Sequence, residues 1–141
     1  MIQAGIDLVK SFEGCKLTAY KDMVGVWTIG WGTTTNVRPG MTISQARADM
    51  LLEHDLDIFE MDVTKLVKVQ LNDWEKAALT SFAYNLGAGA LARSTLLRYL
   101  NKGNKLQAAN EYLKWNRAGG VPVSGLTRRR MAERDLFLRT S

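Results

Sequence analysis

The 141-residue chain is 46% hydrophobic and 23% charged, a balance typical of a globular protein that buries one core. A single cysteine excludes an intramolecular disulfide, and together with a single histidine it excludes a zinc cluster of thiolates and imidazoles. The net charge of +5 favours contact with a polyanion such as nucleic acid, an anionic membrane or an acidic cell wall, although it also serves solubility alone.

The first predicted elements are a helix over residues 1–13 and a small group of strands. In the helix, apolar residues recur at helical spacing on a stripe that ends at Glu13, and Gly14 is placed to stop the helix. From Lys16 to about Pro39 the pattern changes to two short β-type runs, KLTAY and VWTIGW, with turn residues between them. We therefore expect a small sheet directly after the first helix.

Helical patterns fill most of the remaining chain. Thr42 or Ser44 can cap a long helix that extends to about residue 66, and Asn72 opens another helix that Gly87 ends. The apolar stripe of the long helix consists of Met50, Leu52, Leu56, Phe59 and Val63. Further helices are expected at residues 94–102, 105–116 and about 127–139, with a loop before the last one.

Strands gathered in one block among helices predict an α+β fold in a single domain with two lobes. The N-terminal lobe, about 12–42, holds the small antiparallel sheet. The connecting helix covers about 43–67, and the helical C-terminal lobe covers about 68–141 and packs with helix 1–13.

The helical period of the first helix places Glu13 on its apolar face, where an apolar side chain would be expected. Apolar neighbours and the negative end of the helix dipole both disfavour a charged carboxyl group there. A carboxyl group that keeps its proton near neutral pH is what general acid catalysis requires. The alternative interpretation is an exposed glutamate at a frayed helix end.

Asp22 and Thr28 are the other two polar residues of interest in this part of the chain. Asp22 lies in a turn, YKDMVG, where a solvated carboxylate should stay ionised, or should simply bind the local backbone. Thr28 should project from the strand face opposite Trp27 and Ile29, with space beside its hydroxyl, unless it is only a good strand former. An acid, a carboxylate and a hydroxyl that holds water would together suit hydrolysis of a glycosidic bond.

The spacing of these three residues resembles a known family. Eight residues separate Glu13 from Asp22 and five separate Asp22 from Thr28, which is the catalytic pattern of the phage-type lysozymes (endolysins, glycoside hydrolase family 24). The segments EGCKLTAYKD and GVWTIGWGTT are similar to that family's N-terminal lobe, and FAYNLGAGALARSTLLRYLNKG and GLTRRRMAERDLF to its C-terminal lobe. The resemblance covers nearly the whole chain and is strongest to endolysins of lambdoid phages.

This resemblance implies a two-lobed lysozyme-like fold and an N-acetylmuramidase that lyses the host cell. The enzyme would cut the β-1,4 bond between N-acetylmuramic acid and N-acetylglucosamine, with no cofactor or metal. Glu13 would be the general acid, Asp22 would assist the water or the developing charge, and Thr28 would position the water in an inverting reaction.

The resemblance also implies supporting residues in the C-terminal lobe. Tyr84 and Asn85 match the family's wall of the cleft, and an arginine of TRRR should pair with the catalytic glutamate. The candidates are Arg128, Arg129 and Arg130, of which we favour Arg129. The chain departs from some relatives in one place, because Thr33 stands where they carry a histidine after the GxG turn.

The expected partner is cell-wall peptidoglycan, with no nucleic acid, no stable membrane insertion and a monomeric state. The sequence shows no secretory signal and no membrane-tethering segment, so we expect accumulation in the host cytoplasm and release to the wall through a separate holin. Cys15 lacks a neighbouring base and is expected to be a packed residue, and His54 is expected to be structural or exposed.

Two other functions remain open from the sequence. A nucleic-acid-binding helical domain is supported by the charge and by TRRRMAER, although a pattern of base-reading residues is missing. A non-catalytic wall-binding module would keep the fold but would be expected to lose one of the three polar residues.

Overall fold

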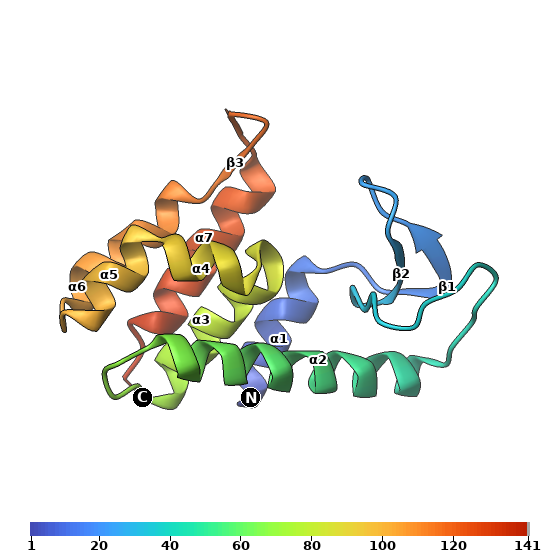
Figure 1. Ribbon diagram of the computed structural model, residues 1–141, viewed down its shortest axis with the longest axis horizontal. Coiled ribbons are helices and arrows are strands. Elements are labelled where there is room, and N and C mark those ends of the chain that lie inside the picture. The colour runs from blue at the N-terminus through green and yellow to red at the C-terminus, as the bar shows by residue number, and fades with distance from the viewer. Residues whose placement is uncertain (141) are drawn as a thin grey trace.

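The computed structural model describes residues 1–140 and has the α+β architecture that the sequence predicts. A long helix, α2 (Gln45–Leu66), runs along one side of the molecule. A small hairpin lobe stands over one end of α2, and a cluster of helices stands over the other (Figure 1).

Helix α1 (Gln3–Phe12) buries Ile6 and Val9 but ends differently from the prediction. The backbone leaves the helix at Glu13, which is extended (φ −90°, ψ 134°), so Gly14 does not form a left-handed cap. Glu13 therefore follows the helix as its C-cap residue instead of lying within its last turn.

The hairpin consists of β1 (Lys16–Lys21) and β2 (Trp27–Gly30), which are antiparallel with Tyr20 opposite Thr28. Gly25, at φ +86°, supplies the left-handed conformation that the tight turn between the strands requires. Because β1 and β2 are paired, the end of β1, the start of β2 and the turn between them lie beside one another at one edge of the lobe.

Helix α2 is capped by the hydroxyl of Ser44, which accepts a hydrogen bond from the backbone N–H of Arg47 at 3.1 Å. Leu52, Leu56 and Val63 are fully buried, as the stripe predicts, but Met50 is 58% exposed. Because a helix turns about 100° per residue, Met50 lies about 200° away from Leu52 and faces solvent.

Helix α3 (Asp73–Leu86) lies at the centre of the C-terminal lobe and packs against α1, α2 and α7. Its start is the predicted capping box, in which Asn72 and Glu75 each bind the other's backbone N–H at 2.8 Å. Because it is surrounded, α3 buries residues on all its faces, from Ala77 to Ala83.

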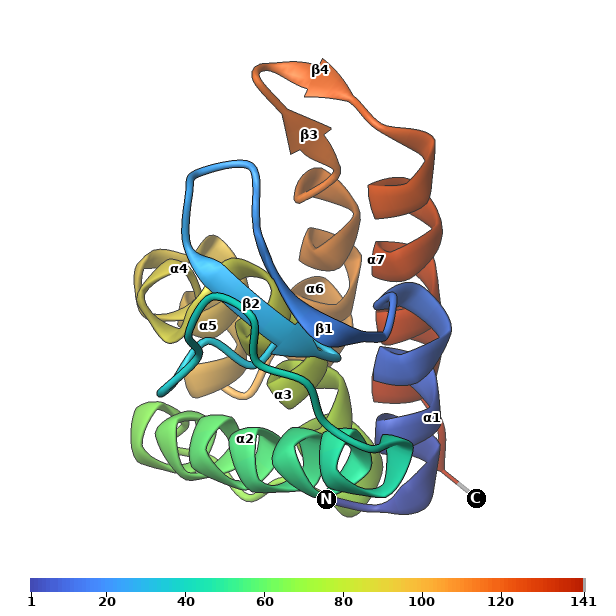
Figure 2. The same cartoon turned by 90° about the vertical axis from the view of Figure 1, so that its right-hand side faces the viewer.

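The remaining elements surround α3. In chain order they are α4 (Ala88–Arg93), α5 (Thr95–Asn101), α6 (Lys105–Glu111), the 3₁₀ turn η1 (Tyr112–Lys114), β3 (Arg117–Ala118), β4 (Val121–Pro122) and α7 (Ser124–Phe137). Helices α1 and α7 lie side by side, and the β3–β4 hairpin projects beyond α7 (Figure 2).

Three of these elements differ from the prediction. Helix α4 was not expected, because six residues are too few to show a helical period. The helix expected at 105–116 ends at Glu111, and the loop expected before α7 is partly a hairpin. Gly119 and Gly120 both have positive φ, which allows the tight two-residue turn of that hairpin.

Within residues 1–140, no helix is both long enough and apolar enough to span a membrane.

Candidate active site

A cleft of about 550 Å³ lies where the hairpin lobe meets α2 and α3. Five of the six site residues proposed from the sequence line it: Glu13, Asp22, Thr28, Tyr84 and Asn85. They come from the end of α1, the β1–β2 turn, strand β2 and the last turn of α3. The fold thus brings together residues that are up to 72 positions apart in the chain.

Glu13 is paired with an arginine from the far end of the chain. Arg129 Nη1 donates a hydrogen bond of 2.8 Å to Glu13 Oε1, and the Glu13 side chain is 24% exposed. The helical pattern around Glu13 does not indicate this partner, because Arg129 lies 116 residues away in the chain. The same contact fixes the direction in which the carboxyl group points.

Arg129 is itself held by a buried network. It is 3% exposed, its Nε donates to Glu133 Oε2 at 3.2 Å, and its Nη2 lies 3.3 Å from the carbonyl oxygen of Ser81. The hydroxyl of Ser81 donates to the same Glu133 oxygen at 2.5 Å. Arg129 is therefore rigidly placed before any ligand enters the cleft.

Glu133 is the residue of this network that sequence reasoning missed. It is fully buried, and burial raises the pKa of its carboxyl group against the opposing effect of the Arg130 and Arg129 guanidinium groups. The available signal was helical spacing, since Glu133 lies four residues after Arg129 and three after Arg130 on one face of α7.

Arg130 connects the same network to the wall of the cleft. Its Nε lies 2.8 Å from Glu133 Oε1, and its Nη2 donates to Asn85 Oδ1 at 2.7 Å. Because Asn85 Oδ1 is occupied in this way, its amide nitrogen is the part of the side chain left for a ligand. Arg129 and Arg130 are both buried in ion pairs, so Arg128 is the one exposed arginine of the TRRR segment.

Asp22 shows the local backbone binding that was one of the two interpretations of its turn. Its Oδ1 accepts hydrogen bonds from the backbone N–H groups of Val24 at 3.0 Å and Val26 at 2.8 Å. Within residues 1–140, Oδ2 receives no hydrogen bond. The turn therefore orients the carboxylate and leaves one of its oxygens available in the cleft.

Thr28 is more enclosed than the strand pattern suggested, with 4% of its surface exposed, but it still lines the cleft. Its hydroxyl donates to the carbonyl oxygen of Val26 at 2.9 Å. Because the proton is used in that bond, the oxygen presents its lone pairs as acceptors. A water molecule that donates to Thr28 would keep its own lone pairs for reaction.

Two tyrosines complete this part of the cleft. Tyr84 donates from its hydroxyl to the carbonyl oxygen of Trp31 at 2.9 Å, and burial, helped by Glu13 and Asp55, raises its pKa far above the ordinary value. Tyr20, which sequence reasoning did not single out, lies opposite Thr28 and has its pKa raised by burial, Glu13 and Asp22. Both phenols therefore remain neutral hydrogen-bonding groups beside the carboxylates.

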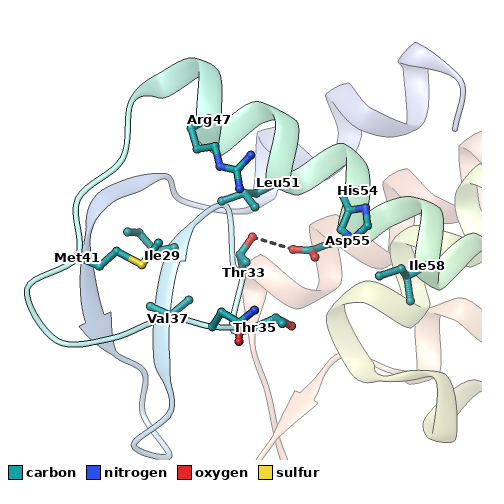
Figure 3. Close-up of a pocket in the computed structure, with 11 residues that line it drawn as sticks. Ile29, Thr33, Thr35, Val37, Met41, Arg47, Leu51, His54, Asp55 and Ile58 are labelled. Atoms are coloured by element: carbon teal, nitrogen blue, oxygen red, sulfur yellow. Dashed lines mark hydrogen bonds between the residues drawn. The ribbon is translucent and has the colours of Figure 1, made fainter.

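Thr33 joins two elements of the fold. Its hydroxyl donates to Asp55 Oδ2 at 2.7 Å, joining the hairpin lobe to α2 (Figure 3). Cys15 is partly buried, with its sulfur 3.7 Å from Gln45 Nε2, and His54 is exposed on α2. Neither residue lines the cleft.

Comparison with known proteins identifies what this chain resembles. Residues 10–133 match the profile of a family described as phage lysozyme. The endolysin of Bacillus phage B103 is 50% identical over 139 residues, which make up 96% of this chain and 53% of that protein. The endolysin of Salmonella phage P22 is 43% identical over 139 residues, covering 95% of this chain and 94% of that protein.

The solved structures agree with the sequence matches. The muramidase domain of SpmX from Asticaccaulis excentricus superposes with a TM-score of 0.92 at 36% identity, over 99% of this chain and 97% of that domain. The chain spans about half the length of the Bacillus phage endolysins that it matches, but nearly all of the P22 endolysin.

Proposed function

The chain belongs to the phage lysozyme family, and on this premise we propose that it is an endolysin with N-acetylmuramidase activity. It hydrolyses the β-1,4 bond between N-acetylmuramic acid and N-acetylglucosamine in bacterial peptidoglycan. The observation that carries this proposal is the meeting of Glu13, Asp22 and Thr28 in one cleft, with Glu13 held by Arg129.

In this proposal Glu13 is the general acid that protonates the leaving glycosidic oxygen. Once it has given up its proton, the carboxylate remains 2.8 Å from Arg129 Nη1, so the charge that develops during the reaction is stabilised. Glu133 accepts a hydrogen bond from Arg129 Nε at 3.2 Å, which fixes the guanidinium beside Glu13.

Asp22 and Thr28 act on the opposite side of the scissile bond. The free oxygen of Asp22 accepts a proton from water or faces the positive charge of the oxocarbenium-like transition state, while Thr28 accepts a hydrogen bond from that water. This division of roles corresponds to an inverting mechanism. We predict the matching separation of the Glu13 and Asp22 carboxyl groups, about 6.5–9.5 Å.

The remaining parts of the proposal concern partners and location. Tyr84 and Asn85 form the wall of the cleft that contacts the glycan, and the chain works as a monomer without metal, cofactor or nucleic acid. The protein accumulates in the host cytoplasm and reaches the wall in the periplasm after a holin has opened the membrane.

The identity of the new reducing end tests this function. Purified protein is incubated with peptidoglycan, the products are reduced with borohydride, and the reduced amino sugar is identified after acid hydrolysis. We expect reduced muramic acid, and none from the Glu13→Gln variant. Reduced glucosamine would show a different bond specificity, and the absence of new reducing ends would overturn the proposal.

A further inference from the structure

Tyr20 shares one face of the β1–β2 hairpin with Thr28 and Asp22. In the register of the hairpin Tyr20 lies directly opposite Thr28, so the two side chains stand on the same face. Asp22 follows two positions after Tyr20, and its backbone N–H still bonds to the carbonyl oxygen of Val26 at 2.9 Å. The alternation of a strand therefore continues to Asp22, and all three side chains line the cleft.

The opposite face of the hairpin follows the same alternation. Lys21 lies opposite Trp27, and its Nζ stands over the Trp27 ring, 5.5 Å from the ring centroid. Neither of these residues lines the cleft. The hairpin thus has an outer face and a cleft face, and the cleft face carries Tyr20, Asp22 and Thr28.

The hydroxyl of Tyr20 is the unused hydrogen-bond donor of the cleft face. Asp22 offers acceptor oxygens, and the proton of Thr28 is committed to the carbonyl oxygen of Val26. The Tyr20 hydroxyl makes no hydrogen bond within residues 1–140. Its ring is held from the side, because Lys16 Nζ lies 4.4 Å from the ring centroid. The phenol is therefore directed into the cleft with its donor free for a ligand.

The Tyr20 hydroxyl lies near both carboxyl groups of the proposed site. Burial raises the pKa of this hydroxyl, and the negative charges of Glu13 and then Asp22 raise it further. Glu13 enters the cleft from the end of α1, whereas Asp22 enters it from the hairpin turn. In the proposed reaction the sugar that is cleaved occupies the space between these two carboxyl groups, because each acts on a different side of it.

We propose that Tyr20 is a further catalytic residue, whose hydroxyl donates a hydrogen bond to an oxygen of the sugar at the cleavage point. This inference rests on the proposed function, because it requires a glycan between Glu13 and Asp22. A neutral phenol donates this bond without adding positive charge beside an oxocarbenium-like transition state. Hydrogen bonds to the sugar that strengthen in the transition state raise kcat more than they lower KM.

Tyr20→Phe tests this role, because it removes the hydroxyl and keeps the ring that Lys16 contacts. Soluble, uncross-linked glycan strands allow kcat and KM to be measured separately. We expect kcat to fall about tenfold, the upper range for one lost hydrogen bond, and KM to change less than about twofold. Tm should be unchanged, because the hydroxyl binds no protein group within residues 1–140.

Tyr99→Phe is the matched control, because Tyr99 lies on α5, outside the cleft, and its hydroxyl also makes no hydrogen bond in the described part of the chain. It should leave kcat and KM unchanged. Three results for Tyr20→Phe would overturn the assignment: an unchanged kcat, a loss confined to KM, or a loss of activity accompanied by a lower Tm. If the wild-type protein cleaves no glycan, the proposed function itself is wrong, whereas an active wild type with an equally active Tyr20→Phe refutes only the role of Tyr20.

Discussion

The carboxyl group of Glu13 is held in place by a residue from the far end of the chain. Arg129 Nη1 donates to Glu13 Oε1 at 2.8 Å, and Arg129 is in turn bound by Glu133 and by the carbonyl oxygen of Ser81. A general acid must be directed at the leaving oxygen before the reaction and must be stabilised as a carboxylate after it. In the proposed mechanism the contact with Arg129 provides both the orientation and the stabilisation.

Replacement of Glu13 by glutamine removes the transferable proton and leaves the shape of the side chain. We expect Glu13→Gln to lower the rate of wall hydrolysis by at least about 10²–10⁴-fold, the usual contribution of general acid catalysis. The apolar stripe alone would predict a more stable protein, but the lost ion pair with Arg129 should lower Tm slightly instead. Turbidity of a wall suspension and thermal unfolding measure the two effects, and turnover at the wild-type rate would exclude Glu13 as the acid.

Thr28 is suited to hold water because its own proton is already committed to Val26. Thr28→Val keeps the volume of the side chain and removes the oxygen, so we expect most activity to be lost while the fold persists. The cost to stability should be about 1 kcal/mol, that of one hydrogen bond. Thr28→Ser, which restores the oxygen, serves as the control. A fully active valine variant would show that the hydroxyl does not position the water.

At the level of elements, the turn that follows β2 makes a close approach to Tyr84 of α3. Gly32 has φ +118°, and a side chain at this position would lie 2.9 Å from the hydroxyl of Tyr84, which binds Trp31. We expect Gly32→Ala to lower the free energy of unfolding by about 1–3 kcal/mol, as for other strained backbone positions. It should also reduce activity, because the hairpin carrying Thr28 must shift away from α3.

Gly14→Ala is the matched control, since its φ is not positive and no atom lies within 4 Å of the added carbon. It should leave stability unchanged or slightly raised. Urea denaturation of both variants measures the difference, and equal stability of the two would contradict the proposed close approach.

Local sequence patterns were sufficient for some features of this fold and not for others. The capping box at Asn72 and the stripe of α2 depend on neighbours in the chain, and both were predictable, except that Met50 was wrongly assigned to the stripe. The spacing of Glu133 from Arg129 and Arg130 was visible in the sequence, but its burial was not, because Glu133 is covered by the fold and bound by Ser81, 52 residues away. The β3–β4 hairpin was also missed, because two residues per strand give no period to detect.

Some features of the active site were likewise predictable from the sequence, and others were not. The spacing of Glu13, Asp22 and Thr28 pointed to one reaction, and the structure places all three in one cleft, while their roles remain proposals. The choice of Arg129 among three adjacent arginines came from the resemblance, and in the structure Arg129 is the one that contacts Glu13. The position of Glu133 beside Arg129 and that of Tyr20 opposite Thr28 became visible only in the folded structure.

At the scale of the whole molecule, the net charge of +5 should speed encounter with an anionic wall. We expect hydrolysis of intact walls to fall as salt is added, since the screening length shortens to about 3 Å at 1 M. Hydrolysis of uncharged chitin-like oligomers should change much less. Equal salt sensitivity on the two substrates would show that charge steering is not the cause.

In the proposed reaction, water held by Thr28 and Asp22 attacks the sugar on the face opposite Glu13. Proton NMR of glycan cleaved within the spectrometer tests it most directly, because the first anomer formed is seen before mutarotation. From the β-linked substrate we expect the α-anomer first, the inverting outcome. The β-anomer first, or a covalent glycosyl adduct on Asp22 in the wild-type protein, would contradict it.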